Sequence, residues 1–189
     1  MPRRPDARPD ARPGARPDVR VEVVPARDDW PARFEHERTA LAAAVGDAAL
    51  SIEHVGSTAV PGLAAKPTID ILLVVRATEA FLERLGEVEA LGYDHRGDNA
   101  VVGSATHLFL RKVVDGTRTH HLHVLTSGAP EIDDYRRFRD ALRADPALAA
   151  EYEQLKLALA ARHASDRMGY VVNKARWVDA CVDALRHAG

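Results

Sequence analysis

The sequence contains one cysteine, no long apolar run and no large excess of either charge. Cys181 is the only cysteine among 189 residues, which excludes an intramolecular disulfide framework and a cysteine-rich zinc module. No apolar run approaches the roughly 20 residues that a membrane-spanning helix needs. The N-terminus also lacks the apolar core of a secretory signal. We therefore expect a soluble, cytoplasmic protein.

The charges are nearly balanced, with 26 Lys and Arg against 28 Asp and Glu. This balance gives no general electrostatic reason to expect nucleic-acid coating or binding to an anionic membrane. The sequence also lacks a Walker phosphate loop, a dinucleotide-binding glycine triplet and a nucleophile elbow around serine. The function must therefore be sought in other motifs, and the oligomeric state stays open.

The composition divides the chain into a tail and one domain. Residues 1–18 form a degenerate Arg-Pro-Asp-Ala repeat, and frequent proline without large apolar residues predicts disorder. A solvated leader is the simpler interpretation, and an arm for an anionic partner is the alternative. The remaining residues 19–189 are expected to form a single domain, with a sheet core over 19–127 and a helical part over 128–189.

The hydrophobic pattern predicts a mixed α/β (or α+β) fold, with strands first and helices last. The predicted strands are Val19–Val24, Leu50–Val55, Ile69–Val75, and a hairpin of His107–Val114 with Thr117–Leu125 around Asp115-Gly116. The predicted helices are one capped by Asp28 that buries Trp30, Phe34, Leu41 and Val45, then 78–91 stopped by Gly92, Pro130–Arg143, Pro146–His163 and Arg167–His187. A turn is expected around residues 96–99.

The segment after the second strand is a candidate phosphate-binding loop. Gly56 allows close approach of the backbone to a ligand, and Ser57 adds a hydroxyl beside exposed N–H groups. Lys66 can add a positive charge to the same loop. We interpret residues 56–67 as a loop that binds phosphate, most effectively if a short helix starts at Thr58.

Asp70 interrupts an otherwise apolar strand. A carboxylate inside a strand that is covered on both faces is costly unless a metal ion, a cation or hydrogen-bond donors compensate it. We interpret Asp70 as a functional residue. The structural alternative is that it caps a neighbouring loop or pairs with an arginine.

Two histidines share one face of the second hairpin strand. His121 and His123 alternate with Leu122 and Val124, so their side chains project side by side. Such a pair can bind a metal, polarise a phosphate, or act as acid and base near neutral pH. Their nearness to Asp70 is a hypothesis at this point.

Several stretches closely resemble the GrpB family. They are EHVGSTAVPGLAAKPTIDILLVV (residues 53–75), HLHV (121–124), FRDALRADP (138–146) and YVVNKARWV (170–178). The resemblance covers nearly all of residues 19–187. It implies a nucleotidyltransferase-like core, a mixed sheet with flanking helices and a helical C-terminal part, because this family is a branch of the nucleotidyltransferase superfamily.

The resemblance also implies site residues. Active members of the superfamily place a Gly-Ser element before two acids one residue apart, with a third acid on a later strand, and hold divalent metal with them. Gly56-Ser57 matches the first element, but Asp70 stands alone, since either Leu72 or Thr68 occupies the second acidic position. The third position corresponds to His123. The implied metal site is Asp70 with His123, and Mg²⁺ or Mn²⁺ is the candidate ion, although Mg²⁺ prefers oxygen ligands.

Further polar residues can complete the pocket. Arg111 and Lys174 are candidates to bind phosphate, as is His54 if it rather than Glu53 faces the pocket. Arg139 and Lys156 can contribute charge or stay in ion pairs. Three functions follow as hypotheses. The first is binding of a nucleotide or other phosphorylated small molecule, with transfer of a nucleotidyl or phosphoryl group by Asp70, His121 and His123. The second is a non-catalytic sensing or accessory module, related to coenzyme A. The third is a metal-dependent hydrolase with histidine and aspartate ligands.

Overall fold

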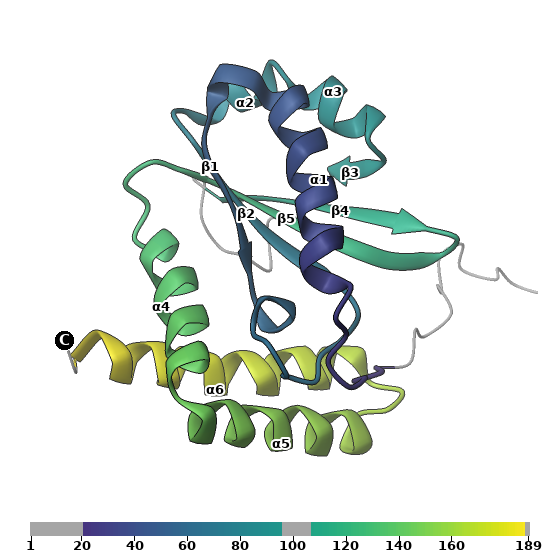
Figure 1. Cartoon of the computed structure of the whole chain (residues 1–189), viewed down its shortest axis with the longest axis vertical. Helices are drawn as coiled ribbons and strands as arrows, with labels where there is room; N and C mark the ends of the chain where they lie inside the picture. Colours follow the sequence, from purple (N-terminus) through teal and green to yellow (C-terminus); the bar gives the residue numbers. More distant parts are fainter. Residues whose placement is uncertain (1–20, 96–106, 188–189) are drawn as a thin grey trace, which may run out of the picture.

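The fold is a five-stranded mixed sheet with helices on both faces (Figure 1). The computed structural model describes residues 21–95 and 107–187. The strands are β1 (Ala49–Val55), β2 (Ile69–Val75), β3 (Tyr93–His95), β4 (His107–Val114) and β5 (Thr117–Thr126). The helices are α1 (Trp30–Val45), α2 (Thr78–Leu82), α3 (Leu85–Ala90), α4 (Glu131–Ala144), α5 (Pro146–Arg162) and α6 (Arg167–His187), with single 3₁₀ turns η1 (Gly46–Ala48) and η2 (Ser57–Ala59). The predicted tail and the turn around residues 96–99 lie outside the described residues. The predicted mixed α/β class is confirmed.

The strand order is β1-β2-β5-β4-β3. Only β2 and β5 pair in parallel, and the other neighbours are antiparallel. The parallel pair brings together two strands far apart in sequence and sets Asp70 opposite His121. The hairpin between β4 and β5 forms where it was predicted, because Asp115 (φ 50°) and Gly116 (φ 75°) both adopt the positive φ that a two-residue turn of this kind requires.

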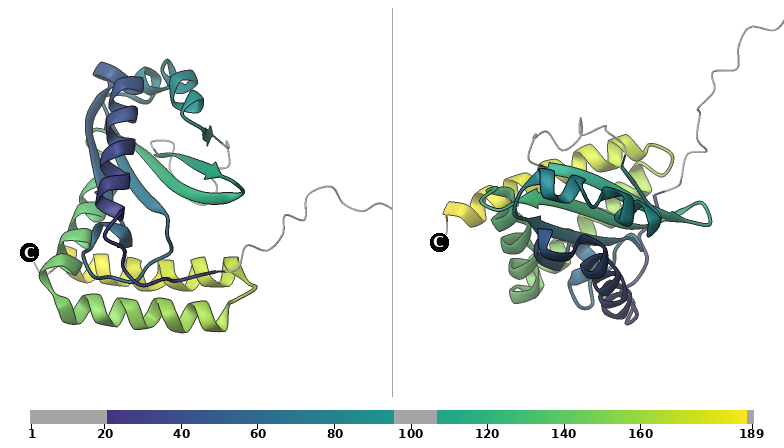
Figure 2. Two further views of the ribbon diagram at one scale, coloured as in Figure 1. Left: turned by 45° about the vertical axis from the view of Figure 1, so that its right-hand side comes forward. Right: turned by 90° about the horizontal axis from the view of Figure 1, so that it is seen from above.

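The first face of the sheet is covered by α1, with α2 and α3 beyond it (Figures 1 and 2). Trp30, Leu41 and Val45 of α1 pack with Ile71 and Leu73 of β2 in the largest buried apolar cluster. This is the helical spacing that the sequence predicts for α1. Burial of these side chains gives the main hydrophobic stabilisation of the sheet.

The second face is covered by the C-terminal helices. Ile132 of α4 packs on Leu72 and Val74 of β2, and α5 runs beside α6 as a layer at one end of the molecule (Figure 2). The loop after β1 is fastened to α5, since Glu153 accepts a hydrogen bond from the backbone N–H of Ala64 at 2.7 Å. These contacts hold the helical part against the sheet and frame a cleft between them.

Three local predictions need correction. The described part of Val19–Val24 forms no strand and makes one bridge, from Val24 to Ala65 of the loop. The residue before α1 is Asp29, not Asp28, and its carboxylate pairs with Arg27 rather than capping the helix. Residues 78–91 form two short helices because the backbone leaves helical geometry at Arg84.

The helices of residues 21–95 and 107–187 include none that is both long and apolar enough to cross a membrane.

Candidate functional site

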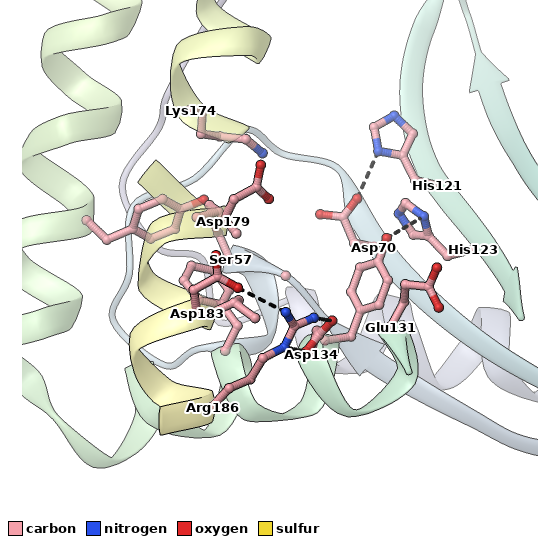
Figure 3. A pocket seen from close by; sticks show the side chains of 16 residues that line it. Ser57, Asp70, His121, His123, Glu131, Asp134, Lys174, Asp179, Asp183 and Arg186 are labelled. Carbon is pink, nitrogen blue, oxygen red and sulfur yellow. Dashed lines mark hydrogen bonds and ion pairs between the residues drawn. The ribbon is translucent and has the colours of Figure 1, made fainter. Parts of the chain in front are cut away.

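A cleft lies between the second face of the sheet and helices α4 and α6 (Figure 3). One cavity, of about 510 Å³, is lined by six predicted site residues: Gly56, Ser57, Asp70, His121, His123 and Lys174. A second cavity, of about 520 Å³, shares five of them and adds Lys66 and Arg111. We call the two adjoining cavities together the cleft. The first cavity forms its acidic end and the second its basic end.

The strand register explains why these side chains meet. Asp70 of β2 lies opposite His121 of β5, and Leu72 lies opposite His123. Directly opposed residues of a sheet point to the same face, and every second residue of a strand repeats that direction. Asp70, His121 and His123 therefore all project from the second face, toward α4 and α6.

Asp70 and His121 form a hydrogen-bonded pair, with 2.8 Å between Oδ1 and Nδ1. Burial raises the pKa of Asp70, but the hydrogen bond from His121 and the nearby positive charges outweigh it and lower the pKa to about 2. The carboxylate is thus ionised at neutral pH and can only accept, so Nδ1 of His121 donates. The other ring nitrogen, Nε2, is buried without a hydrogen-bond partner.

Gly56 packs directly against the Asp70 carboxylate. A Cβ at position 56 would lie 2.6 Å from Oδ2 of Asp70, and the φ of +70° with ψ of −169° is a conformation that glycine almost alone adopts. The glycine is therefore needed for close approach to Asp70 as well as for the predicted loop. Ser57 follows it and lines both cavities, at the start of the single turn η2.

His123 has different partners from His121. Its Nδ1 lies 3.0 Å from the Tyr135 hydroxyl and 3.1 Å from Nε2 of His107. Burial lowers the pKa of His123 to about 3, so the ring is neutral at physiological pH. Asp70 is thus hydrogen-bonded to His121, and His123 belongs to a neighbouring group of aromatic rings.

Tyr135 was missed by the sequence analysis. It lines the acidic end of the cleft together with Glu131 and Phe138 of the same helix. Their spacing of four and three residues places them on one face of α4. The pattern is visible in the sequence, but it does not reveal which layer this face contacts.

The basic end of the cleft concentrates positive charge. Its cationic lining residues are Lys66, Arg111, Arg118, Lys156, Arg167 and Lys174. Burial and the neighbouring positive charges of Arg167 and Lys174 lower the pKa of Lys66 to about 8. Tyr152 raises the pKa of Lys174 and the Asp70 carboxylate adds to this, against the effect of burial. Cations gathered in this way favour an anionic ligand.

Besides Asp70 and Lys174, which it shares with the basic end, the acidic end carries four further carboxylates and one arginine. They are Glu131, Asp134, Asp179, Asp183 and Arg186. Arg186 bridges Asp134 and Asp183, with 2.8 Å between its Nε and Asp134 Oδ1 (Figure 3). The two ends of the cleft therefore differ in sign of charge.

Two of the candidate polar residues lie elsewhere. His54 points to the first face, where its ring stacks on Phe34 at 4.7 Å between centroids, and burial lowers its pKa to about 4. Its Nε2 lies 3.0 Å from Oγ1 of Thr58. Arg139 binds Glu53 and Asp140. The alternation of β1 thus turns Glu53, rather than His54, toward the helical part.

Lys156 does line the basic end, but it is 2% exposed and donates a hydrogen bond to the carbonyl of Ala64. Its ammonium group lies 4.6 Å from the centre of the Tyr152 ring. Burial and the charge of Lys174 lower the pKa of Lys156 to about 7. Its role is therefore to fasten the loop as well as to add charge.

The described residues around Asp70 do not by themselves form a complete set of ligands for a divalent metal ion. Oδ1 of Asp70 accepts from His121, and Oδ2 lies against the backbone of Gly56. Leu72 is fully buried and apolar, and the hydroxyl of Thr68 donates to a backbone carbonyl. Within residues 21–95 and 107–187, no three His, Cys, Asp or Glu side chains gather as ligands of one ion. Mg²⁺ at this place would have one carboxylate of the described chain, that of Asp70, and would take its other oxygen ligands from water or from the phosphates of a ligand.

The sheet and its cleft beside three C-terminal helices define a mixed α/β protein with a polar site between its two parts. Residues 20–184 match the family model of the GrpB protein, and the chain belongs to the GrpB family. The crystal structure of the conserved protein GrpB from Enterococcus faecalis is similar, with a TM-score of 0.80 and 34% identity over 88% of this chain and 99% of that one. The predicted family is confirmed.

Curated relatives are longer than the part that they share with this chain. The protein YqkA of Bacillus subtilis is 37% identical over 158 residues, which cover 84% of this chain and 45% of YqkA. A dephospho-CoA kinase of Mycolicibacterium paratuberculosis is 32% identical over 193 residues, 89% of this chain and 46% of the kinase. The chain thus spans about half the length of these two proteins. A distant likeness, with a TM-score of 0.47 and 14% identity over 71% of this chain and 42% of the other, is to the Cid1 poly(U) polymerase.

Proposed function

We propose that the protein binds a nucleotide or another phosphorylated small molecule in the cleft and transfers a nucleotidyl or phosphoryl group from it to an acceptor hydroxyl. The observation that carries this proposal is the Asp70–His121 pair, 2.8 Å apart, at the edge of a cavity lined by cations. The pair supplies a site for a proton, and the cations supply a site for phosphate oxygens.

Binding is assigned to the basic end. Arg111 is 13% exposed, and its Nε has no hydrogen-bond partner. Lys66 and Lys174 approach the same cavity from the loop and from α6. Guanidinium groups bind phosphate through paired hydrogen bonds, and ammonium groups bind it as point charges. Ser57 and the backbone at Gly56 complete the wall beside Asp70.

The transfer step is assigned to His121 with Asp70. Asp70 fixes Nδ1 of His121 as a donor, which leaves Nε2 as the basic nitrogen of the ring. Nε2 is buried in the ligand-free protein, and it takes the proton of the acceptor hydroxyl once ligand binding exposes it to the cleft. The hydroxyl oxygen then forms a bond to phosphorus, and the bond to the leaving group breaks with its electron pair. The leaving group is pyrophosphate when a nucleotidyl group is transferred and the nucleoside diphosphate when a phosphoryl group is transferred. Asp70 stabilises the protonated ring, and Lys174 and Arg111 stabilise the charge on the phosphate oxygens.

The test is calorimetric titration of the full chain with ATP and with pyrophosphate, repeated for Lys174→Met. Loss of this cation should weaken binding by roughly tenfold or more, since charge-assisted hydrogen bonds contribute about 1.5–3 kcal/mol. Arg84→Met is the matched control, because Arg84 is half-exposed and pairs with Glu87. Release of pyrophosphate from ATP reports nucleotidyl transfer, release of ADP without free phosphate reports phosphoryl transfer, and Asp70→Asn should abolish either. Absence of binding by the wild-type protein, or equal affinity of Lys174→Met, would contradict the proposal.

A second candidate is a non-catalytic sensing or accessory module for a coenzyme A-related compound. The observation in its favour is that this chain resembles part of a protein named dephospho-CoA kinase. Binding of dephospho-CoA without release of any product, unchanged in this respect by Asp70→Asn, would favour this function over transfer. The metal-dependent hydrolase has no comparable support, because the donor set at Asp70 does not match its needs.

A further inference from the structure

The basic end of the cleft has an excess of positive charge that its own residues do not balance. Its described lining holds five cations, Lys66, Arg111, Arg118, Arg167 and Lys174, against two carboxylates, those of Asp70 and Asp94. Lys156 adds only part of a charge, because its pKa is lowered to about 7. Asp94 pairs with Arg111 at 3.5 Å, and Asp70 is hydrogen-bonded to His121. Few acids therefore remain for the other cations.

The cations also repel one another. Burial and the charge of Arg111 lower the pKa of Arg167. Burial and the charges of Arg167 and Lys174 lower the pKa of Lys66 in the same way. Like charges held close together at partly buried positions are unfavourable until an anion lies between them. The cavity is thus prepared for a ligand with several negative charges.

The cations come from separate elements. Lys66 lies in the loop before β2, Arg111 on β4, Arg118 on β5, and Arg167 with Lys174 on α6. They surround a cavity of about 520 Å³. One phosphate group would contact only part of such a ring, whereas a row of two or three phosphate groups can reach cations on several sides.

A metal ion at Asp70 would compete with contacts that are already made. At Oδ1 it would have to displace Nδ1 of His121, and at Oδ2 it would have to fit beside the backbone of Gly56. It would also enter a region where the Lys174 ammonium group interacts favourably with Asp70. Electrostatic repulsion by the surrounding cations opposes a further positive charge.

On the basis of the proposed function, we propose that the cleft binds a compound with two or more adjacent phosphate groups in its metal-free form. Lys174, Arg111 and their neighbours supply the positive charge that a divalent metal supplies in other phosphate sites. The ionised Asp70 then repels the anionic ligand, while it still accepts the hydrogen bond from His121. Magnesium, which neutralises the ligand, weakens its binding.

The experiment is calorimetric titration of the full chain with inorganic tripolyphosphate, pyrophosphate and ATP, in EDTA and in millimolar MgCl₂. We expect binding in EDTA that is tighter than binding in magnesium. Equal affinity under the two conditions, or tighter binding with magnesium, would overturn this inference and leave the proposed function intact. Absence of binding under both conditions would remove the proposed function as well.

The variant Asp70→Asn distinguishes metal-free binding from metal-dependent binding, because the two predict opposite changes in ligand affinity. The amide still accepts the hydrogen bond from His121, and removal of one negative charge beside the cations should tighten tripolyphosphate binding by roughly threefold or more. If Asp70 held a metal, the same variant would lose binding. A thermal melt of the variant verifies that it is folded, and Asp183→Asn, at the acidic end, is the control that should change the affinity less.

Discussion

The two faces of the sheet differ in how their charged residues are paired. On the first face, Glu37 of α1 is 2% exposed and binds Lys112 at 2.9 and 3.0 Å, with His120 at 3.9 Å. On the second face, Asp70 binds His121, but the cations around them exceed the acids. Of two adjacent residues of β5, the neutral His120 thus lies beside a closed ion pair on one face, and His121 faces an open cleft on the other.

This difference separates stability from binding. A buried ion pair with both partners in place is costly to break, because one charge is then left without compensation. Unbalanced charges along a cavity instead reduce stability and favour a ligand of opposite charge. We infer that Glu37 and Lys112 stabilise the fold and that Asp70, His121 and Lys174 serve the site.

The largest expected effect is a loss of stability in mild acid. Burial lowers the pKa of His54 and His120 to about 4 and that of His123 to about 3, below the ordinary value of about 6.5. The unfolded chain therefore takes up protons below pH 6.5 that the folded protein does not, and each histidine reduces the free energy of unfolding by about 1.4 kcal/mol per pH unit between pH 6.5 and 4.

Urea unfolding at pH values between 8 and 5 measures this slope. Asp70 does not affect this slope. Its pKa is lowered to about 2, so its contribution to the free energy of unfolding is lost only as the pH falls from about 4 toward 2. His54→Gln should remove its own share of the slope, about 1.4 kcal/mol per pH unit, and the other buried histidines, His107 included, should keep the rest. A stability that stays constant down to pH 5 would contradict neutral burial of these rings.

The second prediction concerns the closed ion pair of Glu37 with Lys112. Glu37→Leu leaves the Lys112 ammonium group, 20% exposed, without its partner, and should reduce the free energy of unfolding by about 3 kcal/mol. Replacing Lys112 by Met in the same protein should restore most of this loss. Glu35→Leu, at an exposed position of the same helix, is the control for helix propensity. Tripolyphosphate affinity of the folded protein should not change, and a large change would contradict the separation of the two faces.

The smallest expected effect concerns the contact between the loop and Asp70. Gly56→Ala should lose about 1–3 kcal/mol of stability, because alanine disfavours this backbone conformation. Its Cβ would also displace the Asp70 carboxylate and thereby abolish transfer. Gly62→Ala is the matched control, since Gly62 also has a positive φ, of +78°, but no atom lies within 4 Å of its Cβ position. Equal behaviour of the two variants would show that the contact with Asp70 has no role.

Local patterns were sufficient to predict most elements. Alternation in Thr117–Leu125 indicated which residues share a face, the apolar run Ile69–Val75 indicated a central strand, and Asp115-Gly116 predicted the hairpin turn. All three depend only on neighbours in sequence. The break at Arg84 was not predictable in this way, since nothing in the apolar pattern of residues 78–91 distinguishes one helix from two.

The site was predictable only in part, because it depends on contacts between distant segments. The sequence indicated Asp70 and His121 separately, but their contact requires the parallel register of β2 with β5. Alternation placed Glu53 and His54 on opposite faces without saying which face meets the helical part. The pairing of Glu37 with Lys112 spans 75 positions, and no local pattern encodes it.

The central claim is that the second face binds phosphate and the first face stabilises the fold. It is tested most directly by measuring ATP affinity and the free energy of unfolding together for Lys174→Met and Glu37→Leu. We predict that Lys174→Met loses affinity while it keeps nearly all of its stability, and that Glu37→Leu loses stability while its folded form keeps its affinity. If both variants lose affinity to the same extent, or if neither does, the account is contradicted.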